Sequence, residues 1–395
     1  MINSSLQTIS LAHLSLNSAT IGLSLFVLIQ SFTRINQQHV RFLVLFYFFN
    51  LINQLDDLYD FSELWLVIPW LTNAYIPFLF GIAPSFYLYV KQLTAPINTE
   101  KLALNQKPHP HWYWHYSGII VATIFCSPYY LLNTELKLER LLAPTGTLEH
   151  LGVFTIGPSI ALLAVLPFSL CYLILIIRLL DTHLSNVKYY FSNIENKDLS
   201  WLRWSIILFC CVLVVSSVQL FLPSSVSERW FPRFAFLVFE YIWLSIFATL
   251  AIKQKVIYKQ NTEFLNIKES KVQESTKYSR SKISEVDMNR IETKLIKAME
   301  QDSLQSDPSL TLRKLSDTTG VSENRISQVL NLKVGMGFYD FVNYWRIKNA
   351  CEKLKKTNES LLDITFSVGF NSRSTFNLAF KKHTGKTPSA YRRSN

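Results

Sequence analysis

Cysteine is scarce in this 395-residue chain, which has five, and they form no recognisable pattern. No two of them stand as Cys-x-x-Cys, and four of the five lie in apolar runs. They are Cys126, Cys171, Cys210, Cys211 and Cys351. The spacing argues against a disulfide framework and a zinc site, and it predicts that these side chains are small buried apolar groups.

Sequence signatures of common enzymes are also missing. The chain has no P-loop, no dinucleotide-binding fingerprint, no His-Glu-x-x-His pair and no Gly-x-Ser-x-Gly nucleophile motif. It has no histidine-kinase or receiver layout either. We therefore expect no enzyme, no bound metal and no cofactor.

Charged residues are few, at 17% of the chain, and they are unevenly spread. Up to Ile252, thirteen Lys and Arg balance thirteen Asp and Glu. From Lys253 onward, twenty-six basic residues face fifteen acidic ones, so this part carries the whole formal charge of +11. The chain is 49% hydrophobic, with a mean hydropathy of +0.17. A neutral apolar part followed by a basic polar part predicts a membrane domain that carries a nucleic-acid-binding domain.

Residues 1–252 contain seven apolar runs of roughly membrane-spanning length, for which about 20 residues are needed. The runs are Leu11–Phe32, Phe42–Leu58, Trp70–Val90, Tyr116–Leu132, Val153–Leu180, Leu202–Leu222 and Phe234–Ile252. The third and fifth contain prolines, which membrane helices tolerate where neighbouring helices satisfy the freed backbone groups. A soluble all-α core would need polar stripes along these runs, and such stripes are largely absent. The sequence thus predicts an all-α fold that begins with a seven-helix transmembrane bundle.

The Lys and Arg residues of the loops predict the orientation of this bundle. The first, third and fifth loops and the stretch after Ile252 are basic, whereas the second loop has four acidic residues and no basic one. The N-terminus is therefore expected outside and the C-terminus in the cytoplasm, as an odd number of spans also requires. No basic segment precedes Leu11, so the start is not interpreted as a cleaved signal peptide.

A polar stretch from Lys253 to Ile283 predicts a flexible linker. At Ser284 the capping box S-E-V-D opens an amphipathic helix. Its apolar positions are Met288, Ile291, Leu295, Ile296 and Met299. This helix could pack on the domain that follows, the commoner arrangement, or pair with its copy in a dimer.

Residues 284–395 contain two helix-turn-helix units, at about 309–332 and 360–384. In the first, Leu312 and Leu315 share a helix face, Gly320 forms the turn and Ser322 caps a second helix. That second helix buries Ile326, Val329 and Leu330. In the second unit the corresponding positions are Leu361, Ile364, Thr365 and Val368, then Gly369, then Phe376, Ala379 and Phe380. Two short helices joined by a glycine turn, the second with a polar outer face, suit insertion into a major groove.

The stretch Gly369–Arg392, G-F-N-S-R-S-T-F-N-L-A-F-K-K-H-T-G-K-T-P-S-A-Y-R, resembles the AraC/XylS-type DNA-binding domain. The resemblance covers about the last quarter of the chain. It implies two units joined by a rigid linker helix, here Phe338–Lys356, that enter successive major grooves about 34 Å apart. The order of seven spans, linker and paired units is similar to the membrane-embedded members of this family, in layout rather than in residues.

The resemblance also implies which side chains contact DNA. The base-reading positions fall on Asn324, Ser327, Gln328, Arg373, Ser374 and Asn377. Asn and Gln suit adenine edges, and Arg suits guanine. Phosphate contacts, which set affinity and register without reading sequence, are expected from Ser322, Arg325, Lys381, Lys382, Arg392 and Arg393. For each of these residues the alternative is an ordinary solvated surface residue.

Leu378 departs from the family, which commonly has Arg at this position. The departure removes a base or phosphate contact. The second recognition helix is therefore expected to read fewer bases or to bind more weakly, and the first to carry more of the specificity.

Three features of the apolar part could have a function. Glu240 lies within an apolar run, where an ionisable group suggests an intramembrane sensing site; a structural pairing with a neighbouring helix explains it equally well. A histidine-rich loop could bind metal, although an aromatic belt at the cytoplasmic interface is favoured. An acidic group could hold a cation, although a solvated loop is favoured. The loop residues are His109, His111 and His115, and the acidic ones are Asp56, Asp57, Asp60 and Glu63.

Taken together, these patterns predict a membrane-bound one-component transcription regulator. Its binding to double-stranded DNA would be controlled by a small-molecule or membrane signal. The resemblance favours a bacterial cytoplasmic membrane, and activation with RNA polymerase as a partner. A homodimer is compatible with the sequence but not required, because one domain already spans two grooves. Two alternatives stay open, namely a transporter or membrane enzyme with a regulatory DNA-binding tail, and a regulator whose bundle is only a passive anchor.

Overall fold

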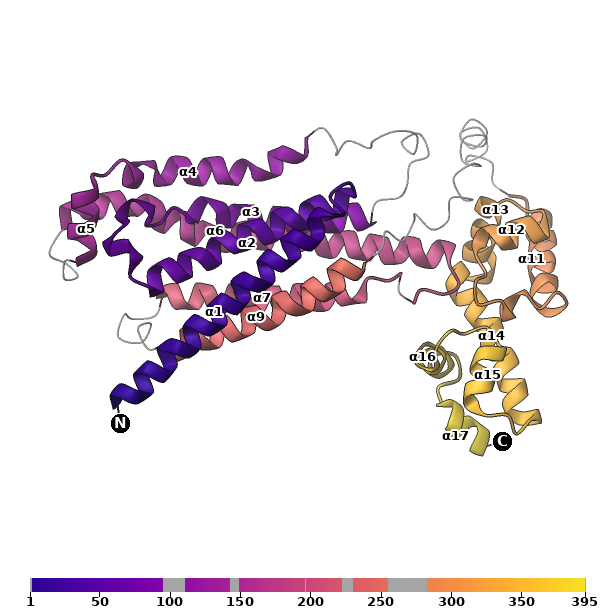
Figure 1. Ribbon diagram of the computed structural model, residues 1–395. Coiled ribbons are helices and arrows are strands. Elements are labelled where there is room, and N and C mark those ends of the chain that lie inside the picture. Colours follow the sequence, from indigo (N-terminus) through magenta and orange to yellow (C-terminus); the bar gives the residue numbers. More distant parts are fainter. Residues whose placement is uncertain are drawn as a thin grey trace. The chain divides into compact units, whose positions relative to one another are not determined.

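The computed structural model describes residues 2–94, 111–142, 149–195, 197–221, 230–254 and 283–394 (Figure 1). These residues are helical and contain no β-strand, in agreement with the predicted all-α class. They form two compact units. The first comprises Met1–Leu180 and Ser200–Lys268, and the second comprises Asp181–Leu199 and Glu269–Asn395. Nearly all of the predicted polar linker lies outside the described residues, as does His109.

Each of the seven apolar runs coincides with a helix of the structure. These are α1 (Ile2–Phe32), α2 (Gln38–Phe61), α3 (Ile76–Thr94), α4 (Ser117–Tyr130), α6 (Glu149–Tyr190), α7 (Ser200–Phe221) and α9 (Trp230–Lys253), and a short α5 (Thr134–Leu142) follows α4. Helix α3 begins at Ile76 rather than at Trp70. The 3-10 turn η2 (Pro69–Leu71) precedes it, and Asn73 adopts a left-handed conformation with φ of 63°, which interrupts a right-handed helix.

Three of these helices are long and apolar enough to cross a membrane, over Leu11–Phe32, Val153–Tyr190 and Phe234–Lys253. A fourth span results if α5 and the helical segment Trp112–Tyr130, which are bent by 86°, count as one. Helix α7 is apolar over the shorter stretch Ser200–Val215. By length and composition, the described residues therefore give three or four spans, and a seven-span bundle stays a prediction.

Aromatic side chains fill much of the interior of the first unit. Helix α2 packs against α1 and α3, and α9 packs against α1 and α7. Phe247 of α9 lies 5.2 Å from the ring of Phe46 and 5.3 Å from that of Phe86. At Gly81 of α3 an added Cβ would lie 2.5 Å from the Phe49 ring, so a small residue permits the close approach of α2 and α3.

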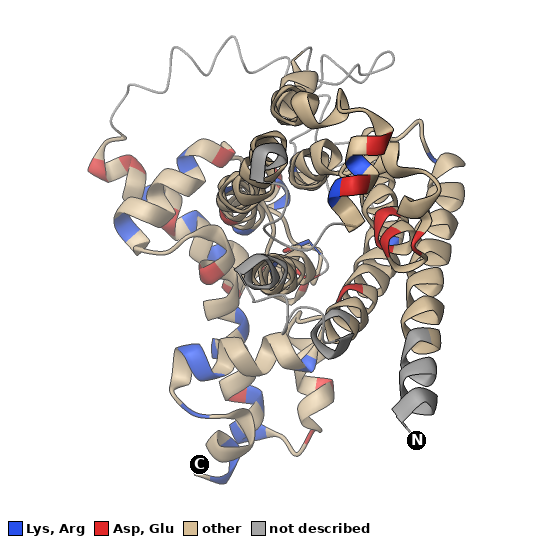
Figure 2. Cartoon of the chain, turned by 90° about the vertical axis from the view of Figure 1, so that its left-hand side faces the viewer, with Lys and Arg blue, Asp and Glu red and all other residues tan. Residues whose placement is uncertain are grey.

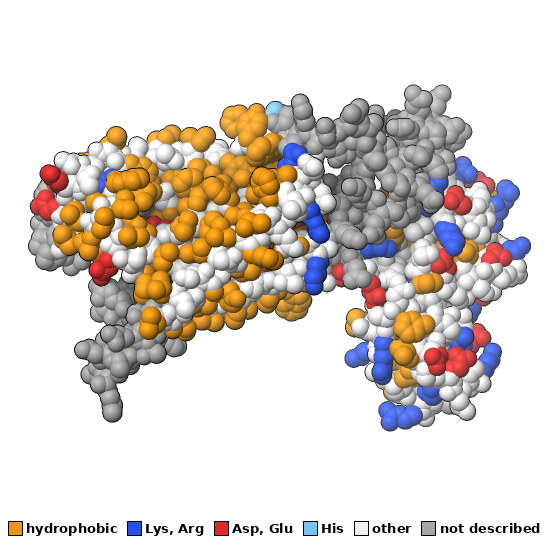
Figure 3. Space-filling view, in the orientation of Figure 1, with side chains coloured by type: hydrophobic (Ala, Val, Ile, Leu, Met, Phe, Trp, Pro, Cys, Tyr) orange, Lys and Arg blue, Asp and Glu red, His pale blue; other side chains and the backbone are white. Residues whose placement is uncertain are grey.

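The outward face of the first unit that Figure 3 shows is largely apolar as well. Ile29, Ile120 and Leu131 are exposed by 72%, 64% and 85%. A water-soluble protein rarely shows contiguous apolar surface of this extent, whereas hydrocarbon chains accommodate it. Because apolar side chains also cover outward faces, the prediction that the cysteines are buried was wrong in part. Cys126 is buried, but Cys171 and Cys211 lie on outward faces.

The second unit contains two apolar cores that share one helix. Its elements are α11 (Glu285–Glu300), η7 (Leu304–Ser306), α12 (Leu312–Thr319), α13 (Glu323–Val329), η8 (Leu330–Val334), α14 (Phe338–Lys356), α15 (Leu361–Ser367), α16 (Arg373–Thr384) and α17 (Pro388–Arg393). In the first core, Phe341 and Val342 of α14 pack with α11, α12 and α13. In the second core, Ile347 and Ala350 of α14 pack with α15 and α16. Helix α14 has the bounds predicted for the linker helix, and it fixes the two helix-turn-helix units to one another.

Helix α11 begins as the capping box predicts, because the Ser284 hydroxyl accepts a hydrogen bond from the backbone of Asp287 at 3.1 Å. Ile291, Leu295 and Met299 are buried in the first core. The helix therefore packs on its own domain. Ile296, predicted on the apolar face, is 37% exposed.

Candidate nucleic-acid interface

Helix α13 presents a polar outer face because its apolar residues point into the first core. Ile326 and Val329 are fully buried, while Asn324 and Arg325 are exposed and Ser327 and Gln328 are half-buried. Gly320 ends α12 with φ of 65°, a conformation that glycine adopts at little cost. Ser322 occupies the N-cap position as predicted, but its side chain makes no capping hydrogen bond. The face of α13 thus presents the side chains predicted to contact DNA in the first unit.

Helix α16 repeats this arrangement in the second unit. Phe376 and Phe380 are buried, whereas Arg373 and Ser374 are exposed and Asn377 is half-buried. Leu378, the position at which the family commonly has Arg, is 74% exposed. An exposed leucine on this helix offers apolar contact and no charge.

Gly369 forms a close contact between the turn before α16 and the element η7. Its φ is 96°, and an added Cβ would lie 2.5 Å from the carbonyl oxygen of Gln305. Both the backbone conformation and the available space therefore require glycine at this turn.

The predicted phosphate-binding residues differ in how the domain holds them. Lys381 and Arg393 are exposed near the C-terminus, where Figure 2 shows several basic residues. Lys382 is 2.7 Å from the Asp340 carboxylate. Arg392 donates from Nη2 to the backbone carbonyl of Glu359 at 2.7 Å. Arg392 therefore also ties α17 to the turn that precedes α15.

Sequence reasoning missed Arg346, which is buried within α14 and 1% exposed. Its guanidinium donates to the carbonyls of Gln305 and Asp307, each at 2.8 Å, and to the carbonyl and hydroxyl of Ser192. Burial lowers the pKa of Arg346 to about 10, so the side chain stays cationic at neutral pH. The signal in the sequence was an Arg between Trp345 and Ile347 in a helix whose neighbouring positions are apolar.

A separate polar cluster lies inside the first unit and includes Glu240. The cluster comprises His13, Asn17, Ser24, Gln54, Asp57 and Glu240, from α1, α2 and α9. Asn17 donates from Nδ2 to the Asp57 carboxylate at 2.5 Å, and Ser24 donates to Gln54 Oε1 at 2.9 Å. Glu240 is 5% exposed and interacts with both Gln54 and Asp57. Three helices therefore bring ionisable and amide groups together in an otherwise apolar unit.

The preference for a solvated acidic loop was wrong for Asp57. Helix α2 continues to Phe61, so Asp56, Asp57 and Asp60 are helical. Asp57 follows Gln54 by three positions, which places both on the face that meets α1. Its carboxylate lies 3.6 Å from Nε2 of His13.

Of the predicted histidine loop, His111 and His115 are described. His115 is 3.1 Å from the Tyr172 hydroxyl and contacts the ring of Tyr87. Within the described ranges, no three His, Cys, Asp or Glu side chains are grouped so that they could hold a metal ion.

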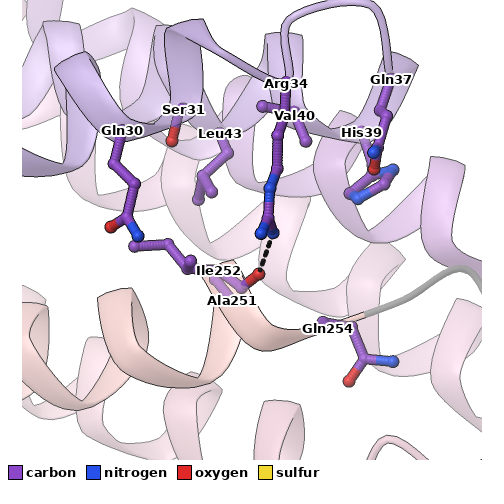
Figure 4. Close-up of a pocket in the computed structure, with 10 residues that line it drawn as sticks. All are labelled: Gln30, Ser31, Arg34, Gln37, His39, Val40, Leu43, Ala251, Ile252 and Gln254. Carbon is purple, nitrogen blue, oxygen red and sulfur yellow. Dashed lines mark hydrogen bonds between the residues drawn. The ribbon is translucent and has the colours of Figure 1, made fainter.

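A small pocket lies where the α1–α2 turn meets the end of α9 (Figure 4). Arg34 Nη1 donates to the carbonyl oxygen of Ile252 at 3.1 Å across this pocket. A cation at a helix C-terminus is favourable, because the last carbonyls carry partial negative charge. The interaction ties α1 to the last turn of α9.

The comparisons with known proteins concern the C-terminal part of the chain. Residues 315–394 match the family described as a helix-turn-helix domain. A putative AraC-like transcription regulator of Streptomyces lividans is 36% identical over 92 residues, which are 23% of this chain and 30% of that protein. An uncharacterized HTH-type transcriptional regulator of Staphylococcus aureus (strain COL) is 39% identical over 83 residues, which are 21% of this chain and 11% of that protein. The chain thus matches less than a third of either relative.

Among solved structures, the chain is similar to the C-terminal domain of AraT, a response regulator from Geobacillus stearothermophilus. The two are 27% identical over 29% of this chain and 89% of that one, with a TM-score of 0.24. The family match makes residues 315–394 a helix-turn-helix domain, and the relatives that are similar to this part of the chain include an AraC-like regulator. The relatives named here are transcription regulators rather than enzymes.

Proposed function

We propose that the chain is a membrane-bound one-component transcription regulator that activates its promoters. One observation carries this proposal. A rigid pair of helix-turn-helix units, with exposed polar faces on α13 and α16, belongs to the same chain as helices long enough and apolar enough to cross a membrane. RNA polymerase would be a further partner, and the arrangement is compatible with a homodimer.

In this proposal the polar outer faces of α13 and α16 read the DNA sequence. Asn324, Ser327 and Gln328 contact base edges from α13, and Arg373, Ser374 and Asn377 do so from α16. Ser322, Arg325, Lys381, Lys382, Arg392 and Arg393 contact the phosphates. The exposure of Arg373 and Ser374 beside the buried Phe376 supports these roles. Leu378 gives α16 one polar contact fewer, so α13 carries more of the specificity.

We infer that the first unit spans the bacterial cytoplasmic membrane seven times, with its N-terminus outside, and that it senses the signal. The polar cluster around Glu240 supports this inference. Ionisable groups are costly in hydrocarbon, so a buried group of them marks a site where a polar ligand or a proton can exchange. Glu240 is the group that we assign to sensing.

Crosslinking of the full-length protein to DNA in its native membrane, followed by sequencing of the captured DNA, tests the regulator. Enrichment at a few promoters is expected, and it should be lost in a variant that carries both Gln328→Ala and Arg373→Ala. No enriched promoter under any growth condition, with the protein present in the membrane, would count against a regulator.

The sensing role is tested at the captured promoters. Glu240→Gln should alter how their transcript levels respond to growth conditions, because it removes an ionisable group and keeps the shape. Glu63→Gln is the matched control, since Glu63 is exposed in the same unit. An unchanged response in Glu240→Gln would favour a passive anchor.

A transporter with a regulatory tail is the second candidate. It is favoured by the pairing of Asp57 with His13 beside Glu240, because ion-coupled transporters need such intramembrane groups. Solute uptake that depends on Glu240 and persists in the Gln328→Ala, Arg373→Ala variant would support the transporter.

A further inference from the structure

The segment Asp181–Leu199 belongs to the second unit although it lies between α6 and α7 in sequence. It contains the end of α6 and the connection that follows. Phe191 forms an antiparallel bridge with Thr311, the residue that precedes α12. The Ser192 hydroxyl donates to the carbonyl of Leu310 at 2.6 Å, and its backbone N–H donates to the same oxygen at 3.2 Å. The segment is therefore hydrogen-bonded into the DNA-binding domain.

Arg346 also holds this segment through Ser192. Its Nη1 donates to the Ser192 carbonyl at 3.2 Å, and its Nη2 donates to the Ser192 hydroxyl at 3.0 Å. Because Ser192 and Arg346 are both almost fully buried, at 1% exposure each, these bonds are shielded from water. Buried charge-assisted hydrogen bonds are among the stronger ones in proteins.

Beyond Ser192, the segment brings a carboxylate to the first turn of α16. Oε1 of Glu195 accepts hydrogen bonds from the hydroxyls of Ser372 and Thr375, the latter at 2.6 Å. Ser372 is the N-cap of α16, and its hydroxyl also accepts from the backbone N–H of Thr375 at 3.3 Å. A helix N-terminus carries partial positive charge and favours an anion. The Glu195 carboxylate is such an anion.

DNA would use the same groups. Serine and threonine hydroxyls and helix N-termini are common ligands of DNA phosphates. Arg373 and Ser374, the predicted base-reading residues, stand between Ser372 and Thr375 in the sequence. A recognition helix that inserts its N-terminal part into a groove brings these hydroxyls to the sugar-phosphate backbone. The Glu195 carboxylate resembles a phosphate in charge sign and in having acceptor oxygens only.

The segment also packs against the first apolar core of the domain, through the partly buried Tyr189. One short connection thus meets both the first core and the start of α16. Its two ends continue along the chain into α6 and α7, which are apolar helices of the first unit.

We propose that Glu195 occupies the position of a DNA phosphate at the start of α16, so that the segment Asp181–Leu199 and DNA compete for Ser372 and Thr375. The segment then acts as an autoinhibitory strap, and a signal that displaces it through α6 or α7 raises the affinity for DNA. This proposal rests on the proposed function, because it presumes that α16 binds DNA.

The test measures binding of full-length protein in nanodiscs to a nonspecific duplex of fixed length at fixed salt. Glu195→Ala and Glu195→Gln should bind more tightly than the unaltered chain, by roughly 5- to 150-fold, the usual range of coupling between sites. Asp198→Asn is the matched control, because it removes the same charge from the same segment, where Asp198 interacts electrostatically with His183. The control should bind like the unaltered chain.

A second experiment distinguishes two roles of Glu195, namely competition with DNA and stabilisation of the start of α16. In the Glu195→Ala background, Thr375→Val should weaken DNA binding, because the hydroxyl is then available to a phosphate. In the unaltered background the same change should have a smaller effect, because it also releases Glu195. If Glu195 only stabilises α16, Glu195→Ala will bind DNA more weakly, and the proposal is wrong.

The remaining outcomes are distinguishable. Equal affinity of the unaltered chain and Glu195→Ala overturns the strap and leaves the regulator intact. Absence of duplex binding by every variant, with the proteins folded, overturns the proposed function together with the strap.

Discussion

Arg346 donates from its guanidinium to the carbonyl and the hydroxyl of Ser192, although 154 positions separate the two residues. The contact joins the linker helix α14 to the connection between α6 and α7. The Arg346 side chain also holds the carbonyls of Gln305 and Asp307. The buried guanidinium of α14 thus hydrogen-bonds to two other parts of the chain, the element η7 with the residue after it and the connection between α6 and α7.

Arg346→Met should destabilise the second unit by at least about 2 kcal/mol, because buried acceptors that lose their donor cost roughly 1–3 kcal/mol each. Thermal unfolding of the full-length protein in detergent measures the change. Lys356→Met on the same helix is the control, since an exposed pair contributes about 1 kcal/mol or less. Equal melting temperatures for the two variants would show that Arg346 is not a structural centre.

Gly369→Ala should destabilise the domain by more than Gly320→Ala does. Both glycines have positive φ, at 96° and 65°, and such a conformation costs other residues about 1–2 kcal/mol. Only at Gly369 does the new Cβ also meet the Gln305 carbonyl, whereas nothing lies within 4 Å of a Cβ at Gly320. The difference in unfolding free energy between the two variants isolates the steric part. A larger loss of unfolding free energy in Gly320→Ala than in Gly369→Ala would contradict the close contact between Gly369 and Gln305.

Gln328→Ala and Arg373→Ala should each weaken binding by about 1–3 kcal/mol at one base position and relax specificity there. Gln328 is half-buried on α13, and Arg373 is exposed at the start of α16. Affinities for a captured promoter site and for singly substituted versions of it provide the measurement. A uniform loss over all versions would mean that these residues do not read bases.

Lys381→Ala should weaken binding to every sequence alike, because a phosphate contact carries no sequence information. The slope of log affinity against log salt concentration should become shallower by about 1. Binding titrations over a range of salt concentrations test this. If Lys381→Ala behaved like Arg373→Ala, the division into reading and clamping residues would be wrong.

Leu378→Arg should tighten DNA binding. The slope of log affinity against log salt concentration should become steeper by about 0.9, as one added phosphate contact makes it. Leu378 is 74% exposed on α16, so the longer side chain can be accommodated without repacking. The same salt titrations show the effect. Weaker binding in this variant would indicate that the leucine itself makes an apolar contact to DNA, such as one to a thymine methyl group.

Much of the second unit could be predicted because its signals are local. Periodic apolar residues defined α12, α13, α15 and α16, and the bounds of α14 agree with those predicted. Gly320 and Gly369 marked turns that the backbone angles confirm. The side chains predicted to read DNA lie on outer faces, and their roles stay predictions.

Other features depend on contacts between distant residues and therefore left little local pattern. Asp57 was read as a loop residue, but the extent of α2 and the approach of α1 place it beside Asn17 and His13. Ile296 and two cysteines were expected to be buried, but packing and the apolar outer faces leave them exposed.

The sequence by itself determined the helices, the paired helix-turn-helix units and the division into an apolar and a basic part, because periodicity, caps and composition act over a few residues. Only the tertiary structure decided that Asp181–Leu199 joins the DNA-binding unit and that Glu195 meets α16. Those contacts span 118 to 180 positions. They depend on how the chain folds back on itself, which no local pattern encodes.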